Sequence, residues 1–335
     1  MKSIRVYLHI FITLIVTICL SCSSEKGTVD NVEEVAIDIT DAIFIKQSSD
    51  CSTYAEEYSS MVKDIQNNIN FEGSVEVEMN TSNCTITVNG IPNHDFNDVT
   101  ASFATRVSEV GRIFSVSRSP SLNTQATALS QQYYDAIMLN GIVVDMLSAG
   151  CYNPNANGAD ADGNTAIGCT VNDGWLLDPL GTESKFGADS HNAHTQPDGT
   201  YHYHGDPKAM FDDDPGANGS PVIGFAADGF PIFGSYFLDS ETNTVRKALS
   251  GYELLSGSRL GPDDNDPGGT YNGTYIDDYE FTGAGDLDEC NGMTVNGQYG
   301  YYTTDNYPWM IACHSATPDD SFRKGQAKLK MDHGH

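Results

Sequence analysis

The sequence predicts a mainly β fold, of the β-rich α+β class, built as a single disulfide-braced domain with long loops rich in Gly, Asp and Asn. Turn-forming residues are abundant, with 32 Gly and 13 Pro in 335 residues, and this composition argues against a helical bundle. Short segments such as 74–78 and 85–88 alternate between polar and apolar residues, as strands do. Most of the 8 Cys follow the N-terminal leader, where they can brace the domain.

Residues 1–21 have the features of a signal peptide. Lys2 and Arg5 make the start positive, and the apolar stretch 6–20 is too short to span a bilayer comfortably. A small residue precedes Cys22, which is typical of bacterial lipoproteins whose first mature cysteine carries the lipid. Ordinary secretion with an incidental Cys22 is the alternative. We expect an exported protein, anchored through Cys22 to the bacterial outer membrane on its periplasmic face or at the cell surface.

Composition divides the rest of the chain into three parts. Residues 22–45 are acidic and then apolar, which predicts a lipid anchor and tether. The range 46–320 holds the alternating segments and the Gly-rich loops, and it predicts the β-rich domain. Residues 321–335 are basic, which predicts a flexible tail. Inside the domain, 52–68 places apolar and aromatic residues at helical spacing without Gly or Pro, so we expect a helix there.

The cysteines that follow the leader predict disulfides, because thiols of exported proteins oxidise. Sequence alone does not fix the pairing, and the simplest scheme joins nearest neighbours. It pairs Cys51 with Cys84, Cys151 with Cys169, and Cys290 with Cys313.

The charge of the chain restricts its partners. Asp and Glu total 46 against 17 Lys and Arg, for a net charge of -29. Such a surface repels phosphate backbones, so we expect no nucleic-acid partner. The same surface tolerates divalent cations. Hydrophobic residues make up 39% of the chain, enough for a folded core.

Two pairs of similar segments predict an internal duplication. Segment 189–204 aligns with 288–302, and 220–223 is similar to 307–310 in the same order. Each copy would contain a loop, a tight turn, a strand and a further strand after a Pro. Chance similarity between turn-rich segments is the alternative. The second copy has Cys290, Met293, Gly300 and Tyr302 where the first copy has histidines.

The histidines of the first copy predict a transition-metal site. They are His191, His194, His202 and His204. On a strand, His202 and His204 share one face, and Tyr201 and Tyr203 share the other. The turn at 197–199 would bring the two earlier histidines opposite that strand. Imidazole nitrogens suit Zn²⁺ or Cu²⁺.

Two carboxylates and two alternative roles complete this hypothesis. Asp189 and Asp228 are candidate ligands, or partners that orient the ligands. The histidines could instead form a structural hydrogen-bonded cluster, or perform acid–base catalysis without metal. We expect a metal-handling protein or a metal-dependent enzyme. The alternative is a non-catalytic surface module that binds glycans or a partner protein through Tyr and Trp faces. The sequence identifies no catalytic residue, since the common enzyme motifs do not occur.

The loop between Cys151 and Cys169 could bind calcium. Asp160, Asp162 and Asn164 have the alternating spacing of a calcium loop, but the final bidentate Glu is missing. A plain acidic turn is the alternative.

Several blocks resemble the signature of the YHYH domain family. The tetrapeptide 201–204, Tyr-His-Tyr-His, follows Pro-Asp-Gly-Thr at 197–200. The segments 90–95, 228–234 and 287–292 also resemble family blocks. The resemblance covers about 85–318 and implies an exported bacterial protein, but no established activity. In many members the tetrapeptide closely follows the block corresponding to 287–292, whereas here 299–302 reads Tyr-Gly-Tyr-Tyr.

Overall fold

The computed structural model describes residues 35–182, 184, 186–263 and 265–325. Contacts divide the chain into two units, Met1–Val35 and Ala36–His335, and the fold described below is that of the second unit. The predicted signal peptide and Cys22 lie outside the described residues. Within those residues, no helix is both long and apolar enough to cross a membrane.

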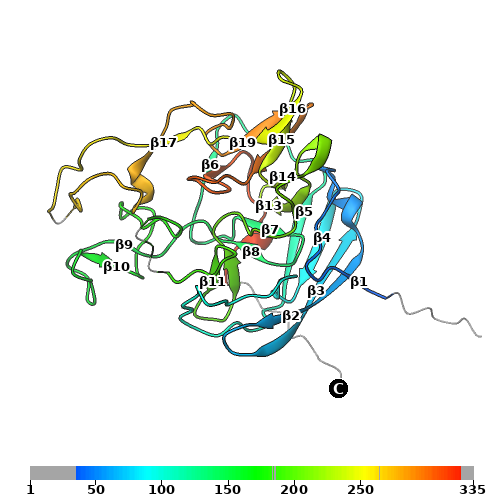
Figure 1. Ribbon diagram of the computed structural model, residues 1–335, viewed down its shortest axis with the longest axis horizontal. Coiled ribbons are helices and arrows are strands. Elements are labelled where there is room, and N and C mark those ends of the chain that lie inside the picture. The colour runs from blue at the N-terminus through cyan, green and yellow to red at the C-terminus, as the bar shows by residue number, and fades with distance from the viewer. Residues whose placement is uncertain (1–34, 183, 185, 264, 326–335) are drawn as a thin grey trace, which may run out of the picture. The chain divides into compact units, whose positions relative to one another are not determined.

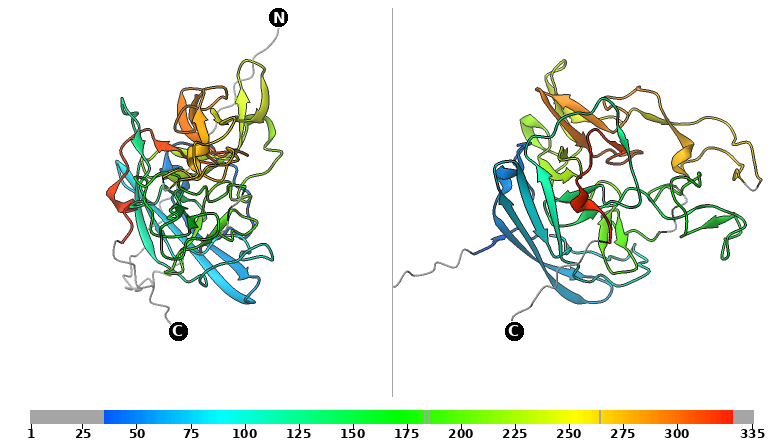
Figure 2. Two further views of the ribbon diagram at one scale, coloured as in Figure 1. Left: turned by 90° about the vertical axis from the view of Figure 1, so that its left-hand side faces the viewer. Right: turned by 180° about the vertical axis from the view of Figure 1, so that it is seen from behind.

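The second unit is mainly β, as predicted, and its two larger sheets are neighbours in the fold (Figure 1). The first is five-stranded with the order β1-β2-β3-β4-β5. Figure 2 shows this five-stranded sheet, in blue and cyan, from two further sides. Its strands are β1 (Ile37–Asp38), β2 (Glu57–Asp64), β3 (Ile69–Met79), β4 (Asn83–Val88) and β5 (Arg112–Ser117).

The second sheet is eight-stranded with the order β11-β12-β8-β7-β13-β14-β20-β19. Its strands are β7 (Ala136–Met138), β8 (Val143–Val144), β11 (Ala193–Thr195), β12 (Tyr201–Tyr203), β13 (Val222–Ala226), β14 (Pro231–Phe233), β19 (Gly292–Val295) and β20 (Gln298–Tyr302).

Small two-stranded sheets and 3-10 turns make up the remaining regular structure of the described chain. The strand pairs are β9 (Cys151–Tyr152) with β10 (Asn164–Thr165), β15 (Tyr236–Asp239) with β16 (Thr244–Lys247), β17 (Tyr252–Leu254) with β18 (Tyr279–Phe281), and β6 (Thr127–Ala128) with β21 (Cys313–His314). The 3-10 helices are η1 (Cys51–Tyr54), η2 (Gly216–Asn218), η3 (Ile276–Asp278) and η4 (Asp320–Phe322).

The helix predicted over 52–68 is wrong. Only η1 is helical, and β2 follows it as a strand paired with both β1 and β3. Burial in β2 alternates, with Ser60, Val62 and Asp64 inside, whereas Met61 of the predicted helical face is exposed. Pairing with β3 along the whole strand therefore overrides the apparent helical period.

Two predicted boundaries also change. Residues 36–45 were assigned to the tether, but β1 pairs in parallel with β2 and Ile39 is buried, so this segment belongs to the domain. The predicted tail begins too early, because Phe322 is fully buried and packs on Phe114. Residues 326–335 lie outside the described part of the chain.

The three predicted disulfides are confirmed. Cys51 is bonded to Cys84, Cys151 to Cys169, and Cys290 to Cys313.

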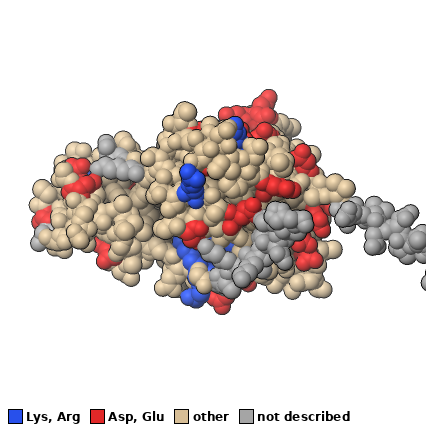
Figure 3. Space-filling model, turned by 90° about the horizontal axis from the view of Figure 1, so that it is seen from below, with Lys and Arg blue, Asp and Glu red and all other residues tan. Residues whose placement is uncertain are grey.

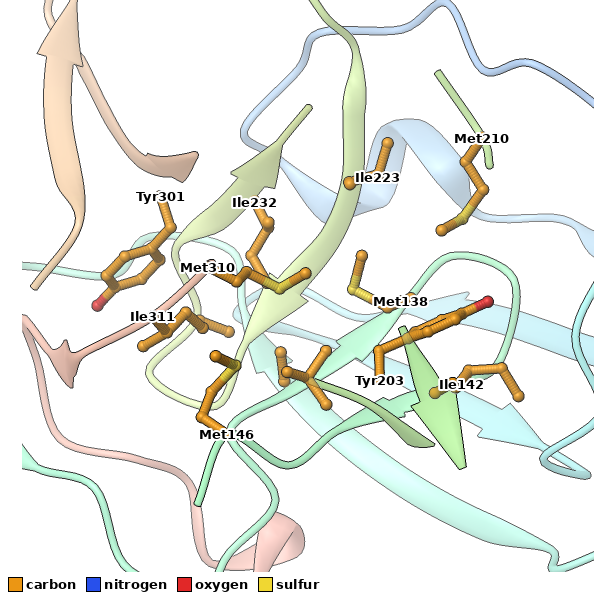
Figure 4. Packing of buried hydrophobic residues seen from close by; sticks show 14 of the residues in the cluster. Met138, Ile142, Met146, Tyr203, Met210, Ile223, Ile232, Tyr301, Met310 and Ile311 are labelled. Atoms are coloured by element: carbon orange, nitrogen blue, oxygen red, sulfur yellow. The ribbon is translucent and has the colours of Figure 1, made fainter. Parts of the chain in front are cut away.

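The eight-stranded sheet is buried on both faces. One face, with Ile137 and Phe225, joins a core shared with β3, β4 and β5 of the other sheet. The opposite face, with Met138 and Ile223, packs under loop residues including Met310 (Figure 4). Strands covered on both sides explain why several of these segments read as continuous apolar runs.

The internal duplication is visible in this sheet, because its strands are arranged symmetrically about the centre. Each strand on one side of the central pair has a counterpart at the same place on the other side. β7 and β13 pair antiparallel at the centre, and each is followed by an antiparallel partner, β8 or β14. A parallel strand comes next, β12 or β20, and its hairpin partner, β11 or β19, forms the edge. We call the half with β7, β8, β11 and β12 the first copy and the other half the second copy.

One part of the predicted duplication is wrong. Segment 220–223 enters β13, but 307–310 forms turns and no strand. The structural counterpart of β13–β14 is instead β7–β8, which lies upstream, so each copy begins with a strand hairpin. Asn140-Gly141 and Asp228-Gly229 form the equivalent turns, and both glycines have positive φ, at 88° and 90°.

Candidate metal centre

The edge hairpin of the first copy brings three of the four predicted histidines together. His194 on β11 is the register partner of His202 on β12, and His204 follows directly after β12. The connecting turn depends on Gly199, which has a φ of 86°. A side chain there would also collide with Ser108, whose Oγ would lie 2.1 Å from the added Cβ. The turn thus needs glycine for both conformation and space.

We call His194, His202 and His204 the histidine triad. One nitrogen from each ring lies within 4.8 Å of the other two. The Nε2 atoms of His194 and His204 are 2.9 Å apart. His202 and His204 are each 3% exposed, and His194 is partly buried. As predicted, Tyr201 and Tyr203 point to the opposite face, where they join the apolar core.

Backbone carbonyls fix the protonation of two rings. Nδ1 of His194 lies 2.7 Å from the carbonyl oxygen of Phe186, and Nδ1 of His202 lies 3.2 Å from that of Thr200. A carbonyl only accepts, so both Nδ1 atoms carry the proton and both Nε2 atoms present a lone pair. This is the arrangement in which metal-binding imidazoles are commonly held.

Burial keeps the triad neutral. It lowers the pKa of His194, and it lowers the pKa values of His202 and His204 well below the ordinary range of imidazole. The neighbouring rings act in the same direction, because a positive charge on one opposes a positive charge on the next. Neutral imidazole is the form that binds a metal ion.

A polar network that sequence reasoning missed lies near His194, close enough for the Asp145 carboxylate to interact electrostatically with that ring. Asp145, just after β8, accepts hydrogen bonds at Oδ2 from Gln196 Nε2 at 2.6 Å and from Lys324 Nζ. Gln196 in turn accepts from the hydroxyl of Tyr134 at 3.3 Å. Burial raises the pKa of Asp145, and Lys324 opposes that shift. Lys324 belongs to residues 321–335, the segment predicted to be a flexible tail. Nothing in the local sequence indicated that it contacts Asp145.

His191 does not join the triad. Its ring stacks on His94, with centroids 3.7 Å apart, and its Nδ1 lies 2.7 Å from the carbonyl oxygen of Pro207. His94 is buried and contacts the hydroxyl of Tyr203 through Nε2 at 2.6 Å. Burial first, and the neighbouring His191 second, lower the pKa of His94 to about 3. His191 lies elsewhere because it precedes β11 in the loop, on the side of the tyrosine face.

Asp189 and Asp228 do not lie with the triad either. Asp189 Oδ2 accepts from the Tyr201 hydroxyl at 2.8 Å, and Asp228 Oδ2 accepts from the Tyr301 hydroxyl at 2.6 Å. Both carboxylates also accept backbone N–H groups, from Asn97 and Ala316 respectively. They therefore brace the tyrosine face of the sheet, opposite the histidine face.

Two side-chain oxygens of the predicted calcium loop already accept hydrogen bonds. Asp160 Oδ1 accepts from the backbone N–H groups of Asp162 and Asn164, and Asn164 Oδ1 accepts from the Tyr275 hydroxyl. Among the described residues, the other group with metal-binding atoms at suitable spacing is Asp50 with Cys51 and Cys84, whose thiols form a disulfide. Calcium binding stays a prediction.

The matched family profile is described as YHYH protein, and it covers residues 113–316. The match spans the whole eight-stranded sheet, including the triad and both copies of the duplication. The chain belongs to the YHYH protein family. The resemblance identified from the sequence is thereby confirmed, although its block at 90–95 precedes the match. This YHYH protein matches no curated protein and no solved structure.

Proposed function

We propose that this YHYH protein is an exported, lipid-anchored protein that binds Zn²⁺ or Cu²⁺ through the histidine triad, as a metal-handling protein or a metal-dependent enzyme. The observation that carries the proposal is the pair of carbonyl contacts at His194 and His202. They orient two Nε2 lone pairs toward the space shared with His204. Without metal, the His194 lone pair accepts a hydrogen bond from His204 Nε2 at 2.9 Å, so the metal-free triad is itself a hydrogen-bonded cluster, and the metal would take the place of that shared proton.

The surroundings of the triad favour a cation. Burial makes protonation of three adjacent rings costly, so a metal ion can supply the positive charge that protons cannot. The surface of the protein as a whole is also acidic, and on the face seen in Figure 3 acidic side chains outnumber basic ones. Such a surface raises the local concentration of cations.

For the enzyme version of the proposal, the candidate substrate space is a cavity that is lined by Phe186 and by none of the triad histidines. Phe186, whose carbonyl holds His194, lines a cavity of about 610 Å³ together with Arg259 and Tyr275. The cavity is large enough for a small organic molecule. Its polar and aromatic lining does not identify one reaction.

Export and anchoring are supported by the leader and by the disulfides. Residues 1–21 and Cys22 have the pattern of a lipoprotein signal, and three disulfides suit an oxidising compartment. A Cys22→Ala variant should leave the membrane fraction or persist as uncleaved precursor. Mature wild-type protein without lipid on Cys22 would contradict the anchoring.

The glycan-binding or partner-binding alternative has less support. Within the described residues every Tyr and Trp side chain is buried or half-buried, so no fully exposed aromatic face supports this function.

Metal analysis of protein produced without a His tag tests the proposal. After dialysis against Zn²⁺ or Cu²⁺ at a pH about one unit above the ~6.5 of free imidazole, wild type should retain one ion per chain. His202→Ala should lose it, and His191→Ala, a histidine outside the triad, should keep it. At free metal about 100 times the dissociation constant, the ion should stabilise wild type by ~2.7 kcal/mol. Equal metal content in all three proteins would refute the triad as the site.

A further inference from the structure

Asp145 lies on the histidine face of the sheet, beside the triad. β8 pairs in parallel with β12, with Val143 opposite His202 and Val144 opposite Tyr203. The next residue, Asp145, donates its backbone N–H to the carbonyl of Tyr203 at 3.0 Å. Since side chains alternate along a strand, Asp145 shares the face of Val143 and therefore that of His202 and His204.

The second copy confirms this placement. There the equivalents of Asp145 and His204 are Phe233 and Tyr302, which are register partners across β14 and β20. Their rings are stacked with centroids 5.0 Å apart. The two positions thus correspond in the two copies, and they hold a pair of aromatic rings in the second copy and a carboxylate and an imidazole in the first.

The two oxygens of the Asp145 carboxylate differ in their hydrogen bonding. Its side chain is 5% exposed. Oδ2 accepts from Gln196 and Lys324, whereas Oδ1 is buried and accepts no hydrogen bond among the described residues. Leaving a buried carboxylate oxygen without a partner is costly, so this oxygen has reason to take a ligand.

Lys324 places a positive charge at the same point. Its ammonium contacts Asp145 and lies over the Tyr134 ring, 5.2 Å from the centroid. It is close enough to the triad to lower the pKa values of His202 and His204, after burial and the neighbouring rings. The segment that carries it is held by the burial of Phe322 and by the hydrogen bond from Lys324 N to Gln132 O at 2.8 Å.

We propose that Asp145 is the fourth ligand of the metal centre, and that the Lys324 ammonium occupies its carboxylate until the metal binds. This inference rests on the metal site proposed above. The incoming divalent cation repels Lys324, which is 22% exposed and can turn toward solvent. The Asp145 carboxylate is not among the ligand atoms that lie within 4.8 Å of one another in the metal-free triad, so binding requires it to move from the ammonium toward the metal. Three imidazoles and one carboxylate complete a four-coordinate shell.

The proposal favours metal handling over hydrolytic catalysis. A hydrolytic zinc site keeps one position open for water, whereas a fourth protein ligand fills it. A resident ammonium that competes for that ligand lowers the affinity for the metal and so favours its release. The C-terminal segment therefore sets the affinity of the site for its metal.

Competition between full-length protein and a chromogenic chelator for Zn²⁺ tests this directly. Lys324→Met should raise the affinity about tenfold, because the competing cation is gone. Asp145→Asn should lower it at least tenfold and change the visible spectrum of the Co²⁺-loaded protein. Lys247→Met is the matched control, since it removes an equivalent charge from an exposed ion pair with Asp305, and it should leave the affinity unchanged.

The outcomes separate this inference from the metal site itself. Urea unfolding in chelator identifies any variant that fails to fold, and Asp145→Glu then replaces Asp145→Asn, with an altered affinity again expected. If His202→Ala loses zinc while the Lys324 and Asp145 variants bind like wild type, the triad stands and this inference fails. Weaker binding by Lys324→Met would also overturn it. If wild type binds no zinc, both proposals fail.

Discussion

The two copies of the duplicated unit use the same backbone for different chemistry. In each, an Asp at the start of the loop caps its own turn and accepts a tyrosine hydroxyl, Asp189 from Tyr201 and Asp288 from Tyr299. The positions of His194, His202 and His204 in the first copy hold Met293, Gly300 and Tyr302 in the second. One hairpin edge is therefore equipped with imidazoles and the other with apolar groups.

The loops of the two copies are also fastened differently. Cys290 of the second copy is bonded to Cys313, while the equivalent residue of the first copy, His191, stacks on His94. A covalent brace thus corresponds to a ring contact. In the second copy a disulfide fastens the loop, whereas the first copy has no such brace and carries the candidate metal-binding histidines.

The largest effect should come from the covalent brace. Replacing Cys290 and Cys313 together by Ala should lower the free energy of unfolding by about 3 kcal/mol, because the disulfide closes a loop with a sequence separation of 23. Metal affinity should not change, since the triad is in the other copy. Urea unfolding and zinc titration measure the two quantities. A loss of zinc binding in a folded variant would show that the copies are coupled.

Exchanging the equivalent turn residues should cost about 2 kcal/mol. Asn140 Nδ2 donates to the Tyr203 hydroxyl at 2.9 Å and to Asn93 Oδ1 at 3.0 Å. Asn140→Asp removes both donors and places a carboxylate against an acceptor. Urea unfolding at neutral pH measures the loss, and Asp228→Asn is the reciprocal variant. Neutral effects in both variants would mean that the copies tolerate each other's residues.

Acid should destabilise the metal-free protein through His94, which packs against the first copy and is held neutral. His94 has its pKa lowered to about 3 in the folded protein, while the unfolded chain takes up a proton near ~6.5. Its contribution is complete above ~6.5 and declines as the pH falls toward the folded value. Between about pH 7.5 and 5.5, wild type in chelator should lose about 1.4 kcal/mol more than His94→Gln.

Comparing wild type with His94→Gln cancels the contributions of other titrating groups, including those that change stability in the opposite direction. Burial raises the pKa values of Asp135 and Asp178 to about 6, so these carboxyls take up protons in the folded state and act in the opposite direction. They are present in both wild type and the variant. Equal pH dependence of unfolding in the two proteins would show that His94 is not held neutral by the fold.

The smallest effect should follow removal of the ring contact. His191→Ala loses the stack on His94 and one contact with the Pro207 carbonyl, at a cost of about 1 kcal/mol. Thermal unfolding in chelator measures this cost. A loss as large as that of the disulfide variant would contradict the idea that the two fastenings differ in strength.

The sequence pattern correctly predicted those features of the fold that depend only on residues close in sequence. The period of 2 at 201–204 placed the tyrosines and histidines on opposite faces, and sequence proximity paired the cysteines correctly. The apparent helix at 52–68 failed because β2 gains its pairing from β1 and β3, which a local period does not report.

The missing parts of the site depend on distant pairing. Asp145 is placed beside β12 by the parallel register of β8 with β12, and Lys324 contacts Asp145 from a position 179 residues further along the chain. His191 was assigned to the site by closeness in sequence, but its place before β11 turns it toward His94. A single sequence contains no signal for the contact between Asp145 and Lys324 or for the stacking of His191 on His94.

Anomalous diffraction from zinc-loaded crystals of the full-length protein tests the central claim most directly. Data collected on both sides of the zinc absorption edge should give one peak per chain, in contact with Nε2 of His194, His202 and His204. The equivalent position beside Met293 and Tyr302 in the second copy should give none. No peak at the triad, or a peak at His94 and His191 instead, would contradict the account.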